Sequence, residues 1–130
     1  MKPISVGLVG LGTVAQGTLK VLANNREELA RRIGREIQIM HIGARRDRDG
    51  VDLSGIRVSR ELMDVAENPE IDVFVELIGG CDFARELIEV AIDSGKHVVT
   101  ANKALIAEYG NGLFERAQQQ GVTIAFEASV

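Results

Sequence analysis

The stretch ISVGLVGLGTVAQG at residues 4–17 decides the fold class. Residues 4–9 are an apolar run typical of a β-strand, and they lead directly into Gly10 and Gly12 before a helical pattern begins. In dinucleotide-binding sheets, the first strand ends in a glycine-rich turn, and the next helix directs its amino end at a pyrophosphate. The stretch therefore predicts a Rossmann-type domain that binds a dinucleotide.

The small residues of this turn have separate purposes. Gly10 allows a tight turn out of the strand, Gly12 lets the backbone approach phosphate, and Ala15 allows the helix to pack closely on the strand. The alternative is a glycine turn that serves packing alone. We expect the turn to bind the cofactor through Gly10, Leu11, Gly12, Thr13 and Val14.

Strand-like and helix-like patterns alternate along the rest of the chain. We expect strands at residues 4–9, 37–42, 56–58, 71–78, 97–100 and 122–126. We expect helices at residues 13–23, 26–33, 59 or 60 to 67, 83–94, 103–108 and 112–120. This order predicts an α/β fold, a doubly wound parallel sheet with helices on both faces. We expect residues 1–130 to form one NAD(P)-binding domain, followed beyond Val130 by a substrate and catalytic domain.

Composition excludes several classes of protein. The 130 residues are 45% hydrophobic and 26% charged, which suits one globular domain. A net charge of −4 and an aromatic content of 4% argue against nucleic acid as a partner. We see no signal peptide and no membrane-spanning run, and a single cysteine indicates a reducing compartment. We therefore expect a cytoplasmic protein without a membrane partner.

Two arginines follow the second predicted strand. A site specific for NAD places Asp or Glu there to bind the ribose 2′-hydroxyl, but this chain has Arg45 and Arg46. Guanidinium groups bind phosphate through paired hydrogen bonds, so the pair predicts a preference for NADP over NAD. Alternatively, both arginines belong to a solvated loop and pair with Asp47 and Asp49.

Gly79 and Gly80 follow the most apolar predicted strand, where ligands of doubly wound sheets bind. This pair either approaches the nicotinamide ribose or makes a plain turn. Glu76 is unusual within such a strand and either reaches the crevice or pairs locally. Cys81 has no identifiable base beside it, so we expect a structural thiol.

Another strand-to-helix junction contains Thr100, Ala101, Asn102 and Lys103. Asn102 can cap the helix, whereas Lys103 opposes the helix dipole at a cost of roughly 0.3–1 kcal/mol. A destabilising residue at this position is a candidate for function, and a lysine there could donate a proton to a carbonyl oxygen. The alternative is a surface lysine. His41 and His97 lack the spacing of metal ligands, and we expect neither to be catalytic.

Together these segments resemble the N-terminal, nicotinamide-binding part of homoserine dehydrogenase. The resemblance rests on residues 10–14, 75–80, 99–105 and 126–130 and spans nearly the whole chain. It implies NAD(P)-dependent interconversion of L-homoserine and L-aspartate 4-semialdehyde, on the route to threonine, methionine and isoleucine. It also implies that Lys103 lies beside nicotinamide and substrate, that Arg45 binds the cofactor phosphate, and that Glu127 and Val130 begin a monovalent-cation (Na⁺) site.

The same resemblance places the substrate-binding residues beyond Val130. We therefore expect this chain to bind cofactor without turning over substrate, and the full-length form to be a homo-oligomer. Two other readings stay open: another amino-acid dehydrogenase, such as an aspartate dehydrogenase, and a non-catalytic module that senses dinucleotides. The sensing module predicts no role for Lys103.

Overall fold

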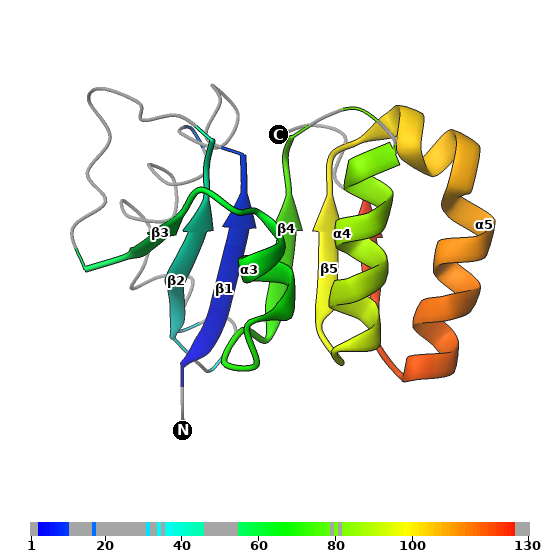
Figure 1. The fold of residues 1–130 in the computed structure, drawn as a ribbon. Coiled ribbons are helices and arrows are strands. Elements are labelled where there is room, and N and C mark those ends of the chain that lie inside the picture. Colours follow the sequence, from blue (N-terminus) through cyan, green and yellow to red (C-terminus); the bar gives the residue numbers. More distant parts are fainter. Residues whose placement is uncertain are drawn as a thin grey trace.

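A computed structural model describes residues 3–10, 17, 31, 34, 36–45, 55–78, 80 and 82–126. In that part of the chain the strands form one parallel six-stranded sheet in the order β3-β2-β1-β4-β5-β6 (Figure 1). The strands are β1 (Ile4–Val9), β2 (Ile37–Gly43), β3 (Arg57–Ser59), β4 (Val73–Glu76), β5 (His97–Thr100) and β6 (Ile124–Phe126). The strand order reverses between β1 and β4, so the predicted Rossmann-type α/β sheet is confirmed.

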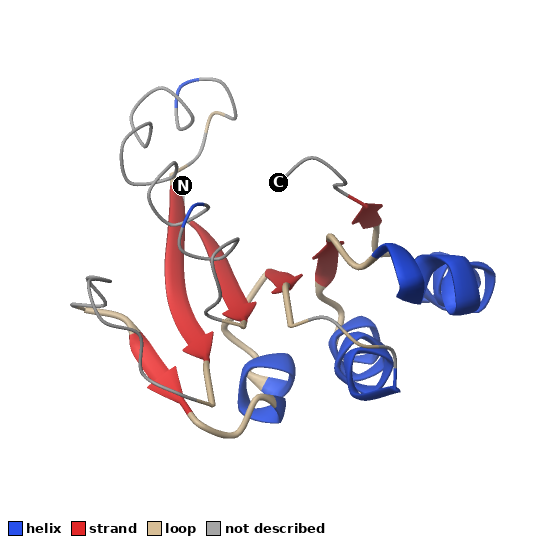
Figure 2. Ribbon diagram, turned by 90° about the horizontal axis from the view of Figure 1, so that it is seen from above, coloured by secondary structure: helices blue, strands red, loops and turns tan. Residues whose placement is uncertain are grey.

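Helices α3 (Met63–Glu67), α4 (Asp82–Asp93) and α5 (Lys103–Gln120) lie on the same face of this sheet (Figure 2). Crossovers between parallel strands run through helices, and α4 and α5 connect β4 to β5 and β5 to β6. The core between the helices and the sheet is apolar. It includes Phe74, Val98, Leu87, Ile88, Leu105 and Leu113.

A glycine in β1 allows α3 to pack closely on the sheet. A Cβ atom at Gly7 would lie 2.6 Å from Cγ1 of Val65, closer than non-bonded carbons approach. Leu8 alternates to the other face, where it is buried with Ile42 in a second, smaller cluster. Apolar residues are therefore buried on both faces of the sheet.

Several predicted boundaries differ from the structure. The helix expected from residue 59 or 60 begins at Met63, because Ser59 ends β3 and its carbonyl accepts a hydrogen bond from the N–H of Ala44. The strand expected at residues 71–78 is confined to β4, since the N–H of Ile78 turns back to bind the Glu76 carboxylate. The last strand begins at Ile124 rather than at residue 122.

The predicted break in the last helix at Tyr109 and Gly110 is wrong. Helix α5 runs without interruption and ends where Gly121 adopts a left-handed conformation. A stripe of buried or half-buried residues at spacings of four crosses the expected break: Leu105, Tyr109, Leu113 and Ala117. Packing of this stripe against the core outweighs the low helix propensity of glycine, about 1 kcal/mol.

The helices predicted at residues 13–23 and 26–33 fall outside the described residues, apart from Gly17 and Arg31, which are both helical. Within the described ranges, no helix is long and apolar enough to cross a membrane.

Candidate functional site

The predicted site residues that the structure describes lie along one edge of the sheet. Because all strands are parallel, their carboxyl ends meet there, and the switch point lies between β1 and β4. Arg45 follows β2, Gly10 follows β1, Gly80 follows β4, and residues 101–103 follow β5. Other predicted positions lie outside the described residues, namely Leu11, Gly12, Thr13, Val14, Arg46, Gly79, Cys81, Glu127 and Val130.

Gly10 makes the turn at the end of β1 that the sequence predicts. Its φ is +99°, and a Cβ atom there would lie 2.9 Å from the backbone carbonyl group of Leu77. Its N–H donates to the carbonyl of Gly43 at 2.9 Å, which ties the turn to β2. A side chain would both strain the backbone and collide with the end of β4, so the tight turn requires glycine.

Glu76 pairs locally at the carboxyl end of β4. The side chain is fully buried, its Oε2 accepts from the N–H of Ile78 at 2.9 Å, and its Oε1 accepts from the hydroxyl of Thr100 at 2.8 Å. Thr100 is also fully buried and stands opposite Glu76 in the β4–β5 register. These bonds join the ends of two neighbouring strands.

Asn102 extends this network to both loops. Its N–H donates to Oγ1 of Thr100 at 3.0 Å, and its Oδ1 accepts from the N–H of Leu105 at 3.1 Å, which confirms the predicted helix cap. Its side-chain amide donates to the carbonyl of Gly80. We call Glu76, Thr100 and Asn102 the polar clamp, because they hold the loop after β4 against the start of α5.

Lys103 is the first residue of α5 and is exposed at the same edge of the sheet. No acidic side chain in the described part of the chain forms an ion pair with it. The polar clamp fixes the backbone immediately before it through Asn102. Within the described residues, Lys103 is therefore an exposed cation without an acidic partner, directly after the carboxyl end of β5.

Arg45 follows β2, on the other side of the switch point from Lys103, which follows β5. Its guanidinium carbon is 5.0 Å from the centroid of the Phe83 ring, within the range of a cation–π contact. The preceding residue, Ala44, is buried and bonded on both sides: its N–H donates to the carbonyl of Ser59, and its carbonyl accepts from Arg60.

Sequence reasoning missed Arg60. It follows β3, and Nη1 of its guanidinium donates to the carbonyl of Ala44 at 3.0 Å, beside Arg45. Two arginines thus follow the neighbouring strands β2 and β3, and the Arg60 guanidinium lies against the backbone that precedes Arg45. Arg60 directly follows a short strand pattern, which could have indicated a side chain at the carboxyl end of a strand. The sequence pattern instead favoured the start of a helix at this position.

His41 forms a buried hydrogen-bonded row with Ser59 and Asn68. Its Nε2 lies 2.7 Å from Oγ of Ser59, and its Nδ1 lies 3.1 Å from Nδ2 of Asn68. The Asn68 amide oxygen accepts from the N–H of Glu70, so the amide nitrogen faces the ring and must donate to Nδ1. The proton of a neutral His41 is then on Nε2, which donates to Ser59 and cannot deprotonate it.

This arrangement gives stability a dependence on pH. Burial, and then the charge of Arg57, lower the pKa of His41 below 6.5, while Asp64 acts in the opposite direction. Below pH 6.5 the unfolded chain binds a proton that the folded chain resists. We expect the free energy of unfolding to be at its full value above that pH and to decrease as the pH falls toward the lowered pKa.

Denaturant unfolding at a series of pH values measures this effect. We expect His41→Gln to flatten the pH dependence in this window, although it lowers stability throughout. His97 is a matched control, because it is exposed and its Nδ1 accepts a hydrogen bond from the N–H of Thr123. The interpretation is wrong if His97→Gln removes the slope and His41→Gln leaves it.

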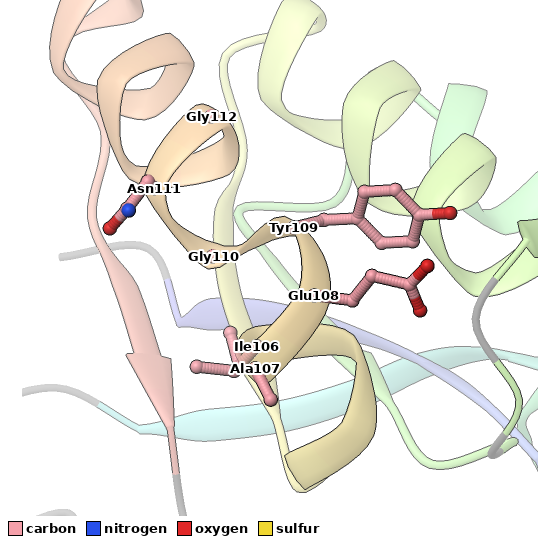
Figure 3. A pocket seen from close by; sticks show the side chains of 7 residues that line it. All are labelled: Ile106, Ala107, Glu108, Tyr109, Gly110, Asn111 and Gly112. Carbon is pink, nitrogen blue, oxygen red and sulfur yellow. The ribbon is translucent and has the colours of Figure 1, made fainter.

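A shallow pocket on α5 does not coincide with this edge. It is lined by residues 106–112 of a single helix, where Gly110 and Gly112 carry no side chains (Figure 3). Tyr109 and Glu108 point toward the same side of the helix in Figure 3, and the Glu108 carboxylate raises the pKa of the Tyr109 hydroxyl.

Among the described residues, no group of three or more His, Cys, Asp or Glu side chains could hold a metal ion. The predicted monovalent-cation positions, Glu127 and Val130, lie beyond the described ranges and stay a prediction.

Comparison with known proteins identifies relatives over the whole chain. The family model described as "Homoserine dehydrogenase, NAD binding domain" matches residues 10–127. A homoserine dehydrogenase of Pseudomonas aeruginosa is 55% identical over 130 residues, and one of Neisseria gonorrhoeae is 43% identical over 131. Each alignment covers all of this chain.

Solved structures agree with these relatives. The crystal structure of a homoserine dehydrogenase from Thiobacillus denitrificans superimposes with a TM-score of 0.91 at 53% identity, over 99% of this chain and 30% of that one. The chain also spans only 30% of the length of the Pseudomonas and Neisseria relatives.

Proposed function

The chain belongs to the homoserine dehydrogenase family and corresponds to the NAD-binding domain of that family, and we propose that residues 1–130 bind NADP(H). In the complete protein this cofactor would serve the interconversion of L-homoserine and L-aspartate 4-semialdehyde. The observation that supports this most is the arrangement along the carboxyl edge of the sheet. Cationic side chains follow β2 and β3, a glycine turn follows β1, and the polar clamp joins β4 to β5.

The fit of a dinucleotide is supported by Gly10. Its positive φ makes the tight turn that ends β1 at the switch point, where a pyrophosphate crosses in this fold class. Under this proposal Arg45, with Arg60 beside it, binds the 2′-phosphate of the adenosine ribose. Lys103 and the loop held by the polar clamp then lie toward the nicotinamide.

When bound, the nicotinamide supplies or accepts the hydride. We propose that the Lys103 ammonium orients the substrate carbonyl oxygen and donates a proton from Nζ as the aldehyde is reduced. For the complete protein we also propose that the substrate is L-homoserine or L-aspartate 4-semialdehyde and that Glu127 and Val130 contribute to a Na⁺ site. The same proposal includes a homo-oligomeric assembly and a cytoplasmic location. The family relationship favours this reading over an aspartate dehydrogenase or a sensing module.

Titration calorimetry with NADPH and NADH tests the cofactor assignment. We expect the complete protein that carries this chain to bind NADPH more tightly. Arg45→Ala should weaken NADPH binding about tenfold and leave NADH binding unchanged, because a hydrogen-bonded charge pair contributes about 1.5 kcal/mol or more.

Salt dependence provides a second readout, because an ion pair with phosphate is screened. The ratio of the dissociation constant for NADH to that for NADPH should therefore decrease as ionic strength rises. Gln38→Ala serves as a control, because this exposed residue is also on β2 but far from its carboxyl end. Equal binding of both nucleotides by the unmodified protein would refute the NADP assignment and leave the fold untouched.

A further inference from the structure

The contact between Arg45 and Phe83 bridges strands that are not neighbours. Arg45 follows β2, whereas Phe83 is in the first turn of α4, which follows β4, and β1 lies between these two strands. The guanidinium carbon nevertheless lies 5.0 Å from the ring centroid. The contact therefore joins the segment after β2 to the segment after β4, on the two sides of β1.

Both ends of this bridge are anchored. The backbone before Arg45 is fixed by the hydrogen bonds of Ala44 to Ser59 and Arg60, at 2.9 and 3.0 Å. Phe83 is half-buried and packs against the main core cluster. An exposed arginine ordinarily samples many rotamers, and ordering it on binding reduces affinity. Here much of that ordering is already present in the folded chain.

A guanidinium can use its face and its edges at the same time. The aromatic ring attracts the face of the planar cation, whereas phosphate oxygens bond to the N–H groups in the plane. Contact with Phe83 thus leaves the edge groups of Arg45 available to a phosphate. No carboxylate in the described part of the chain forms an ion pair with this arginine.

We propose that Phe83 is a positioning residue for nucleotide specificity: its ring holds Arg45 in a conformation that is ready to bind a ribose 2′-phosphate. This inference rests on the proposed function of Arg45. It adds that preference for NADP(H) depends on a residue of α4, which follows β4 and belongs to the other half of the sheet. The ring acts through the arginine and not through its own contact with the nucleotide.

A double-mutant cycle on the complete protein that carries this chain tests this. The affinities for NADPH and NADH are measured by calorimetry for Phe83→Leu, Phe83→Tyr, Arg45→Ala and the Arg45→Ala/Phe83→Leu pair. We expect Phe83→Leu to weaken NADPH binding about three- to fivefold without affecting NADH, the size of one cation–π contact. Phe83→Tyr retains a ring face and should retain the preference.

The decisive result is the effect of Phe83→Leu when Arg45 is already alanine. If Phe83 acts through Arg45, the substitution then changes neither affinity. A loss that persists in that background, or an equal loss of NADPH and NADH binding, overturns the inference and assigns the ring a structural or direct role. If Arg45→Ala itself leaves the preference intact, the proposed 2′-phosphate site is wrong, and the inference fails with it.

Discussion

Lys103→Ala in the complete protein should lower kcat by about 100- to 10,000-fold, the range expected when a positioned proton donor is removed. Lys103 is exposed at the amino end of α5, with its backbone held by Asn102 at the carboxyl end of β5. An ammonium there can hydrogen-bond a substrate oxygen and donate a proton as negative charge develops on it. Steady-state assay of aspartate 4-semialdehyde reduction with NADPH measures the loss.

Lys103→Arg separates charge from proton transfer. Guanidinium retains the positive charge but does not release its proton at neutral pH. We expect this variant to bind NADPH as the unmodified protein does and to remain at least tenfold less active. If Lys103→Ala leaves turnover unchanged, the lysine is a surface residue and the reading as a dinucleotide-sensing module regains support.

Unfolding experiments distinguish this loss from misfolding. A cation at a helix amino end opposes the dipole by roughly 0.3–1 kcal/mol, so Lys103→Ala should be slightly more stable than the parent protein. Removal of a residue that only supports the fold would instead lower the free energy of unfolding. A variant that is more stable and less active indicates that Lys103 is retained for chemistry.

Local patterns in the sequence predicted the strands and the cap of α5. The apolar run before Gly10 predicted β1, and Asn102 preceding a helical pattern predicted the cap that its Oδ1 makes. Such features depend on residues close together in the chain, and their physics is local. The α/β alternation then predicted a parallel sheet, because parallel strands are joined by helical crossovers. The order of the strands came only from the structure.

Features that depend on distant residues were not predictable. Whether Glu76 reached the crevice or paired locally depended on Thr100, which is brought opposite it only by the β4–β5 register. The Arg45–Phe83 contact and the hydrogen bond of Arg60 to Ala44 likewise join separate strands. The continuity of α5 through Gly110 depends on packing against the core, which a scale of helix propensities does not contain.

Glu76→Ala is expected to lower the free energy of unfolding by about 3 kcal/mol. The substitution removes the acceptor for the N–H of Ile78 and for the Thr100 hydroxyl, and Thr100 is fully buried. Each buried donor left without a partner costs about 1–3 kcal/mol. Because the polar clamp also holds the loop at Gly80, affinity for NADPH should fall in the same variant. Denaturant unfolding and calorimetry measure the two effects.

Conservative variants of the polar clamp show whether its bonds act together. Thr100→Val preserves the shape of the side chain but removes the donor to Glu76 and the acceptor for the N–H of Asn102, and we expect it to cost about 1–3 kcal/mol. Once Glu76 is alanine, Thr100→Val should cost less, because their shared bond is already lost. If the losses in the free energy of unfolding of the two single variants add exactly in the double variant, Glu76 stabilises β4 independently of β5. A coupling of at least about 0.5 kcal/mol would instead establish that the ends of β4 and β5 are held as one unit, which a cofactor site spanning both strands requires.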